Sequence, residues 1–246
     1  MKGLFRAAFS VLTASPMLFA AKQATRAPAS NLPSQANLST SMQILLLMTV
    51  LTLLPALIVC LTPFLRLSIV LHFLRQALGT QTVPSNQVLV GLSLFLSLIV
   101  MQPVLSNMYT AAWKPLEEGT IGYQQAMEAG SVPLRGFLLH FAREKDIALF
   151  LEISKSPAPK TPNDLSLSIL GPAYILSEIK VAFQIGAVLF LPFLVIDIVV
   201  ASVSLSVGMV QLPPVMISAP FKILLFVVVD GWTLLVGSLM KGLVQT

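Results

Sequence analysis

Long apolar runs separated by short polar breaks dominate the chain. The first two runs cover residues 42–65 and 86–109, and each is long enough to cross a bilayer as a helix. A third run extends from about 166 to 210, and a fourth covers 212–244. Because a helix satisfies its backbone hydrogen bonds within one segment, this pattern predicts an all-α integral membrane protein.

The runs group into two helical hairpins with a polar region between them. We expect a first apolar hairpin at 42–109, a polar region at 110–165 and a second apolar hairpin at 166–246. Within the polar region, apolar residues recur at helical spacing over 134–153, which predicts helical structure there. The second hairpin is expected to turn at a loop tip near 208–214, which contains a double proline.

The N-terminal part of the chain has a different character. Residues 1–21 have the layout of a secretory signal peptide, with basic residues, an apolar stretch and then small residues. This layout predicts cleavage near Ala20 or Ala21. Residues 22–41 are rich in Ala, Ser, Pro and Gln, which is typical of a flexible leader without a core.

Proline recurs inside the apolar runs. Each proline removes a backbone donor, and lipid tolerates such a break only where protein or a cavity covers it. We therefore expect proline-kinked helices, with bends at Pro55 and Pro63 in the first run. Gly79 and Pro84 predict the end of a helix and a turn after it.

Composition supports the membrane interpretation. Of the 246 residues, 56% are hydrophobic and only 10% are charged, whereas a soluble domain carries roughly 25% charged residues. The net charge of +5 includes no dense basic cluster, which argues against nucleic-acid binding. The single cysteine, Cys60, cannot form an intrachain disulfide.

The sequence carries no recognisable catalytic, metal or cofactor motif. His72 and His140 are too far apart along the chain for metal-ligand spacing. No nucleophile stands beside a base, and neither a phosphate-binding loop nor a dinucleotide fingerprint is present. We therefore expect neither an enzyme nor a cofactor-binding protein.

Basic residues predict an orientation in the membrane. Arg66 and Arg75 lie in a segment without acidic residues, which places that segment on the cytoplasmic side. The mixed-charge region 110–165 then lies on the periplasmic side. Lys241 then falls on the periplasmic side, although basic residues near the ends of membrane spans are more frequent on the cytoplasmic side.

Ionisable residues inside the apolar runs are costly, at about 2.5–3.5 kcal/mol each at the bilayer centre on insertion scales. They are Glu178, Lys180, Asp197, Lys222 and Asp230. Lys222 and Asp230 differ by roughly 80° around a straight helix, so each is expected to meet a partner on another helix or another chain. Two interpretations remain open: ion pairs that fix helix packing, and a path for protons or substrate.

Three stretches resemble the FliP family of flagellar export-gate proteins. They are FLRQALGTQTVPSNQVLVGLSLFLS at 73–97, PAYILSEIKVAFQIGAVLFLPFLVIDIVVASV at 172–203, and LPPVMISAPFKILLFVVVDGWTLLVGSL at 212–239. The resemblance covers nearly everything from about residue 42 to 244. It implies a chain of the bacterial inner membrane and the flagellar basal body, where several copies form a helical multi-subunit pore.

The resemblance also implies function and partners. Family members assemble with FliQ and FliR, lie beside FlhB and FlhA, and pass unfolded flagellar subunits across the membrane by type III secretion. The injectisome counterpart of the same gate is the nearest alternative. A small-solute or proton transporter is a more distant one, because broken helices and intramembrane charges are also typical of transporters, although no internal repeat is evident.

Two sets of residues follow from the resemblance. A pore constriction is expected at Gly208, Met209, Val210 and Gln211, although only Met209 matches the run of methionines that the family often carries there. Subunit contacts are expected at Phe137, Arg143, Phe150 and Glu178, with Arg143 and Glu178 meeting across chains. The two phenylalanines have an equally simple interpretation as core residues of their own chain.

Overall fold

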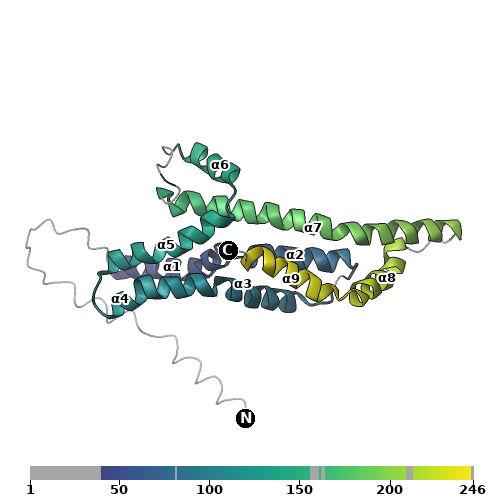
Figure 1. Ribbon diagram of the computed structural model, residues 1–246, viewed down its shortest axis with the longest axis horizontal. Coiled ribbons are helices and arrows are strands. Elements are labelled where there is room, and N and C mark those ends of the chain that lie inside the picture. Colours follow the sequence, from purple (N-terminus) through teal and green to yellow (C-terminus); the bar gives the residue numbers. More distant parts are fainter. Residues whose placement is uncertain (1–39, 81, 156–160, 162–163, 209–212, 245–246) are drawn as a thin grey trace, which may run out of the picture. The chain divides into compact units, whose positions relative to one another are not determined.

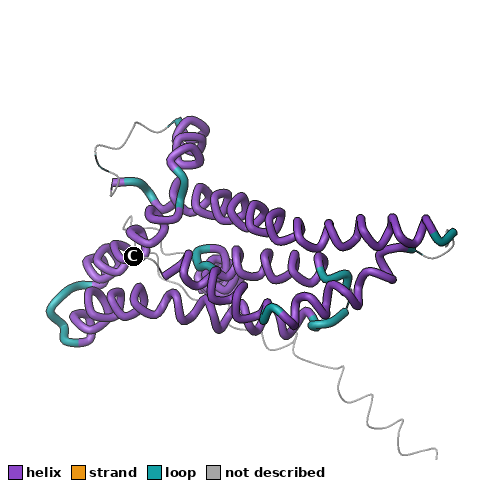
Figure 2. The backbone as a smooth tube through the Cα atoms, turned by 45° about the vertical axis from the view of Figure 1, so that its right-hand side comes forward, coloured by secondary structure: helices purple, strands orange, loops and turns teal. Residues whose placement is uncertain are grey.

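The computed structural model describes residues 40–80, 82–155, 161, 164–208 and 213–244. Every regular element in these residues is a helix, and none of them forms a strand (Figure 2). In chain order the helices are α1 (Thr40–Cys60), α2 (Phe64–Ala77), α3 (Asn86–Met108), the π-helix η1 (Tyr109–Trp113), α4 (Lys114–Glu117), α5 (Tyr123–Phe141), α6 (Glu144–Ser154), α7 (Leu167–Ser206), α8 (Pro214–Val228) and α9 (Gly231–Val244). The predicted all-α fold is confirmed.

The chain divides into two compact units, Met1–Met48 and Thr49–Thr246. In the first unit the described part is the start of α1, and the side chains of residues 41–48 are exposed. The second unit contains the end of α1 and all helices from α2 to α9. The predicted signal peptide at 1–21, and the predicted leader at 22–41 up to residue 39, lie outside the described residues.

Three described helical stretches are long and apolar enough to cross a membrane. They are Ser41–Cys60, Asn86–Glu117 and Leu167–Ser206. Helices α8 and α9 together form a fourth candidate, bent by 65° at a short break. These stretches match the four apolar runs of the sequence, and they indicate a membrane-embedded protein.

Helix α2 forms the centre of the second unit because its apolar residues are buried on several sides. Leu67, Val70, Leu71 and Leu74 are almost completely buried. Helix α2 packs against α7 and α3, and Figure 1 shows α7 running alongside it. The approach to α7 depends on Gly186, because a Cβ atom there would overlap the ring of Phe73 on α2.

Helix α7 is the longest helix in the described residues, with 40 residues. A straight helix of that length extends about 60 Å, twice the roughly 30 Å of a bilayer's hydrocarbon core. Helix α2 packs against both halves of α7, while α5 and α6 pack against its first half and α8 packs against its second half. The helix continues through Pro172 and Pro192, so the bends expected at prolines stay a prediction.

Two apolar stretches of the sequence are each divided by a helix break. The predicted helical stretch 134–153 is two helices, because Ala142 and Arg143 adopt extended backbone between α5 and α6. The last apolar run is also two helices, with Asp230 at a left-handed φ of 50° between α8 and α9. The predicted end of α2 is confirmed, since Gly79 follows it with a φ of 74°.

Candidate functional site

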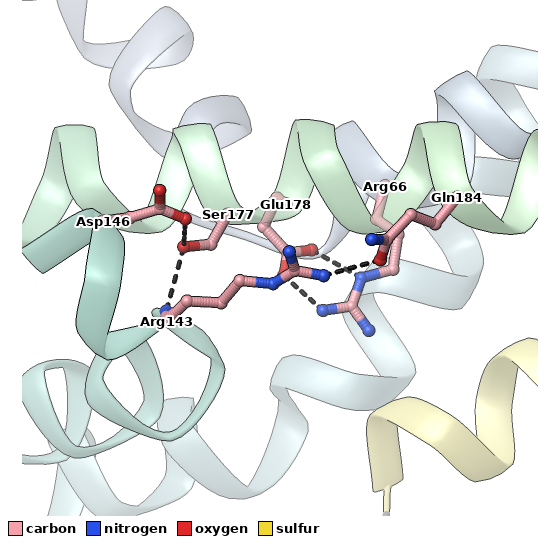
Figure 3. Close-up of polar contacts among 6 residues, drawn as sticks. All are labelled: Arg66, Arg143, Asp146, Ser177, Glu178 and Gln184. Atoms are coloured by element: carbon pink, nitrogen blue, oxygen red, sulfur yellow. Dashed lines mark hydrogen bonds and ion pairs between the residues drawn. The ribbon is translucent and has the colours of Figure 1, made fainter.

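A buried ion pair joins α2 to α7. Arg66 Nε donates a hydrogen bond to Glu178 Oε2 at 2.8 Å, and a second guanidinium nitrogen donates to Oε1 (Figure 3). The Glu178 side chain is fully buried and that of Arg66 nearly so. The guanidinium carbon also lies 5.2 Å from the ring centre of Phe141. A two-point contact of this kind offsets much of the cost of burying both charges.

A second polar cluster fastens α6 to α7. Asp146 is only 2% exposed, accepts a hydrogen bond from Ser177 Oγ at 2.8 Å, and pairs with Lys180. Ser177 Oγ in turn accepts the backbone N–H of Arg143 at 2.9 Å (Figure 3). Helix α6 therefore begins at a point where its first residues are bonded to α7.

Electrostatics favour the charged form of Asp146 in this cluster. Burial alone would raise the pKa of its carboxyl group. The hydrogen bonds from Lys180 and Ser177, together with the charges of Lys180 and Arg143, outweigh burial and lower that pKa. The carboxylate is therefore ionised at neutral pH and holds α6 in place.

The residues predicted for subunit contacts have clear positions within their own chain. Glu178 binds Arg66, while Arg143 Nη2 donates to Gln184 Oε1 at 2.6 Å. The ring of Phe137 packs against Phe141 and Tyr174, with centroids 5.0 Å and 6.0 Å apart. Phe137 thus belongs to the core of its own chain.

Phe150 on α6 is half-buried. The expected contact between Arg143 and Glu178 of different subunits stays a prediction. The Glu178 carboxylate already has a partner inside the chain.

A third polar contact joins the two arms of the C-terminal hairpin. Lys222 Nζ on α8 lies 2.6 Å from Asp197 Oδ2 on α7, and Ser218 Oγ donates to Asp197 Oδ1 at 2.5 Å. The Lys222 side chain is only 4% exposed, and that of Asp197 is 28% exposed. Lys222 therefore meets its counter-charge on another helix, as a buried ammonium group requires.

Asp230 and the described part of the hairpin tip, unlike the other predicted residues, are exposed and have no charged partner among the described residues. Asp230 is exposed at the break after α8, and no ion pair among the described residues includes it. Gly208 is exposed after α7, with a left-handed φ of 80°. Met209, Val210 and Gln211, the rest of the predicted constriction, lie outside the described residues.

Sequence reasoning did not identify three partners in these clusters, namely Arg66, Asp146 and Ser218. In the sequence Arg66 serves only as a topology signal, although a cation among the apolar residues at the start of a helix also indicates a buried counter-charge. Ser218 precedes Lys222 by four residues, the spacing at which two side chains share one helix face.

Nothing in the described part of the chain resembles a metal site, since no group of three or more His, Cys, Asp or Glu side chains comes together there. One polar group is notable for a different reason. The hydroxyl of Tyr174 is fully buried and has no hydrogen-bond partner among the described residues. It lies on α7 one helical turn before Glu178.

The fold and these contacts define an all-α, membrane-embedded protein whose buried charges are paired between helices. A family model described as the FliP family matches residues 47–239. The chain therefore belongs to the FliP family, as the sequence motifs indicate.

Curated relatives agree with the family assignment. The flagellar biosynthetic protein FliP of Pectobacterium carotovorum subsp. carotovorum is 50% identical over 202 residues, which cover 82% of this chain and 78% of that protein. The protein of the same name from Bacillus subtilis (strain 168) is 47% identical over 206 residues, which cover 84% of this chain and 93% of the relative.

Proposed function

We propose that this chain is a pore-forming core subunit of the flagellar type III protein export gate. Several copies assemble with FliQ and FliR beside FlhB and FlhA in the bacterial inner membrane. Unfolded flagellar subunits pass through the assembled pore. The chain acts as a structural and transport component and catalyses no reaction.

The observation that carries this proposal is the extent of the family match. It covers residues 47–239, which include all of α2 to α8 and the first part of α9. The relatives that match over this length carry the name flagellar biosynthetic protein. A match of this length includes the helices that carry all three buried polar clusters.

The distribution of charge within the chain supports assembly. The ion pairs of Glu178 and Lys222 lie between helices of one chain, so they do not need a neighbour to neutralise them. The outer faces of α7 and α8 instead present apolar side chains such as Val199, Val203 and Leu224. Exposed apolar faces of this kind are suited to lipid or to sister subunits.

The hairpin tip is the proposed constriction. Gly208, Met209, Val210 and Gln211 connect the two arms that Asp197 and Lys222 hold together. In the helical multi-subunit pore, these tips converge on the central path. We assign the seal to Met209 and to contacts from neighbouring subunits, because a methionine side chain adapts to irregular gaps.

Native mass in mild detergent tests the proposal. The full chain is purified from membranes with and without FliQ and FliR. We expect one large complex that contains several copies of this chain and both partners. A stable monomer whose mass is the same in both preparations would contradict the export-gate function and favour the alternative of a small-solute or proton transporter.

A phenotype separates the flagellar gate from its alternatives. Deleting the gene should abolish motility and the filament while growth on nutrients continues, and expressing the chain should restore both. Retained motility with loss of an injectisome function would assign the chain to the related secretion system. Loss of growth on one nutrient would indicate a transporter.

A further inference from the structure

An apolar groove lies where the second membrane-spanning stretch meets α5. Its volume is about 500 Å³, and twelve residues from α3, η1, α4, α5 and the start of α7 line it. Two of the lining residues approach each other closely, because a Cβ atom at Gly130 would lie 3.2 Å from Ala112 Cβ. Figure 1 shows α5 returning alongside α4.

The rim of the groove is aromatic and exposed. Tyr109, Trp113 and Tyr123 line it and are at least half exposed, with Trp113 at 58%. The indole Nε1 of Trp113 donates to Glu117 Oε1 at 2.7 Å, which satisfies the polar edge of the ring. Met127 adds an exposed unbranched side chain on α5.

The position of the groove along the span indicates its depth in the membrane. The stretch Asn86–Glu117 has 32 residues, or about 48 Å as a helix, which exceeds the roughly 30 Å of hydrocarbon. The groove uses residues 108–116, near the end of that stretch. Tryptophan and tyrosine concentrate at the membrane–water boundary, so the groove lies at that boundary.

The groove continues the exposed apolar face of the span. Phe95, Leu98, Leu105, Tyr109 and Trp113 are exposed and recur at three-, four- and seven-residue spacing on α3 and η1. Such residues share one side of a helix. Gln102, which is also exposed, lies on the same side between Leu98 and Leu105, so this face is mainly apolar with one amide side chain within it.

We propose that this groove binds an acyl chain of a membrane phospholipid when the chain is inserted in the bilayer. The apolar walls contact the methylenes, and the aromatic rim lies at the level of the glycerol and headgroup. This inference does not depend on the export function, since it concerns the single inserted chain before any neighbour covers the groove.

Bromine quenching of tryptophan fluorescence tests the proposal, because the chain has only two tryptophans. The full chain carrying Trp232→Phe is reconstituted in phosphatidylcholine and phosphatidylglycerol vesicles with or without brominated acyl chains. Trp113 is then the single reporter. We expect strong quenching by the brominated lipid at low protein density.

A matched pair of variants distinguishes binding in the groove from contact with bulk lipid. Ser131→Phe fills the groove, whereas Val132→Phe adds the same ring at an exposed neighbour that does not line it. The first variant should weaken apparent lipid binding at Trp113 about tenfold, because the new ring displaces roughly two buried methylenes of the acyl chain. The second should leave quenching unchanged. Circular dichroism confirms that both variants keep their helices.

Two results would overturn the proposal. Equal quenching in the Ser131→Phe variant and its parent would mean that Trp113 meets bulk lipid only. Absence of quenching in the parent would mean that water or protein occupies the groove. If quenching appears only when protein density is lowered, a second copy of the chain competes for the groove and the acyl chain still binds it.

Discussion

At the scale of single residues, the Arg66–Glu178 pair contributes most clearly to the stability of the fold. We expect Glu178→Gln to lower the free energy of unfolding by about 3–5 kcal/mol, because it leaves a buried guanidinium without its counter-charge. Denaturant unfolding in mild detergent, followed by circular dichroism, measures this change. Replacing both residues by apolar ones, Arg66→Met with Glu178→Leu, should recover much of the loss.

The exposed pair Lys114–Glu118 provides the control for that experiment. Its two charged atoms are 4.0 Å apart, and both side chains are more than half exposed. Removing Glu118 should change stability by less than about 1 kcal/mol. Equal losses for Glu178→Gln and Glu118→Gln would contradict the structural role of the buried pair.

Removing the hydroxyl of Tyr174 should have the opposite effect on the free energy of unfolding from removing the Glu178 charge. Its hydroxyl is buried without a hydrogen-bond partner among the described residues, and such a group costs about 1–3 kcal/mol. Tyr174→Phe removes only this hydroxyl, so we expect stability to stay constant or to rise by about 1 kcal/mol. A clear loss of stability in the same unfolding measurement would reveal a partner for the hydroxyl.

At the scale of elements, Asp146 determines whether α6 stays on α7. Its pKa is lowered below the ordinary value of 3.8 in the folded chain. The stabilisation is therefore complete above that value and is lost as the pH falls through the lower, folded-state pKa. The protection of α6 amides against hydrogen exchange, measured relative to the intrinsic rate at each pH, should stay high at neutral pH and be lost only in strong acid.

Substitution separates this effect from general acid denaturation. Asp146→Asn should speed exchange in α6 at neutral pH, because the amide keeps the shape but loses the charge that pairs with Lys180. Glu152→Gln is the matched control, since Glu152 lies exposed on the same helix. Fast exchange in the control alone would contradict the assignment of the tether to Asp146.

The hairpin of α7 and α8 depends on the Asp197–Lys222 pair. Asp197→Lys should disrupt the hairpin, because it places a second cation beside the buried ammonium group of Lys222. Exchanging both residues, Asp197→Lys with Lys222→Asp, restores opposite charges and should recover part of the native complex mass and of motility. Failure of the exchange to recover either quantity would mean that the orientation of the pair or the Ser218 bond is essential.

The sequence predicts helices better than it predicts their contacts. Apolar runs locate the spanning stretches because their signal is local, and Gly79 marks the end of α2 for the same reason. The break at Arg143 carries no glycine or proline, so composition gives no warning of it, whereas the Asp230–Gly231 dipeptide at the break between α8 and α9 is a common turn signal. The partners Arg66 and Glu178 lie 112 residues apart, and their pairing depends on how α2 packs against α7.

At the scale of the whole molecule, the three polar clusters share one helix. Glu178, Ser177 and Lys180 lie in the first half of α7, and Asp197 lies in the second half. Helix α7 therefore connects α2, α6 and α8 through charged contacts along its length. A chain held together in this way can keep its internal packing while its apolar outer faces exchange lipid for neighbouring subunits.

The basic residues also predict which ends of the helices face each compartment. Arg75 in the last turn of α2 places the following segment, between α2 and α3, in the cytoplasm, and the region containing α4 to α6 then lies in the periplasm. Single cysteines test this topology in the Cys60→Ala background, at Ser85→Cys and Glu128→Cys, since both side chains are exposed. An impermeant maleimide should label Glu128→Cys in spheroplasts, whereas Ser85→Cys should react only after the membrane is opened. The reverse pattern would mean that the chain has the opposite orientation in the membrane. Labelling of both sites from outside would mean that α3 does not span the bilayer.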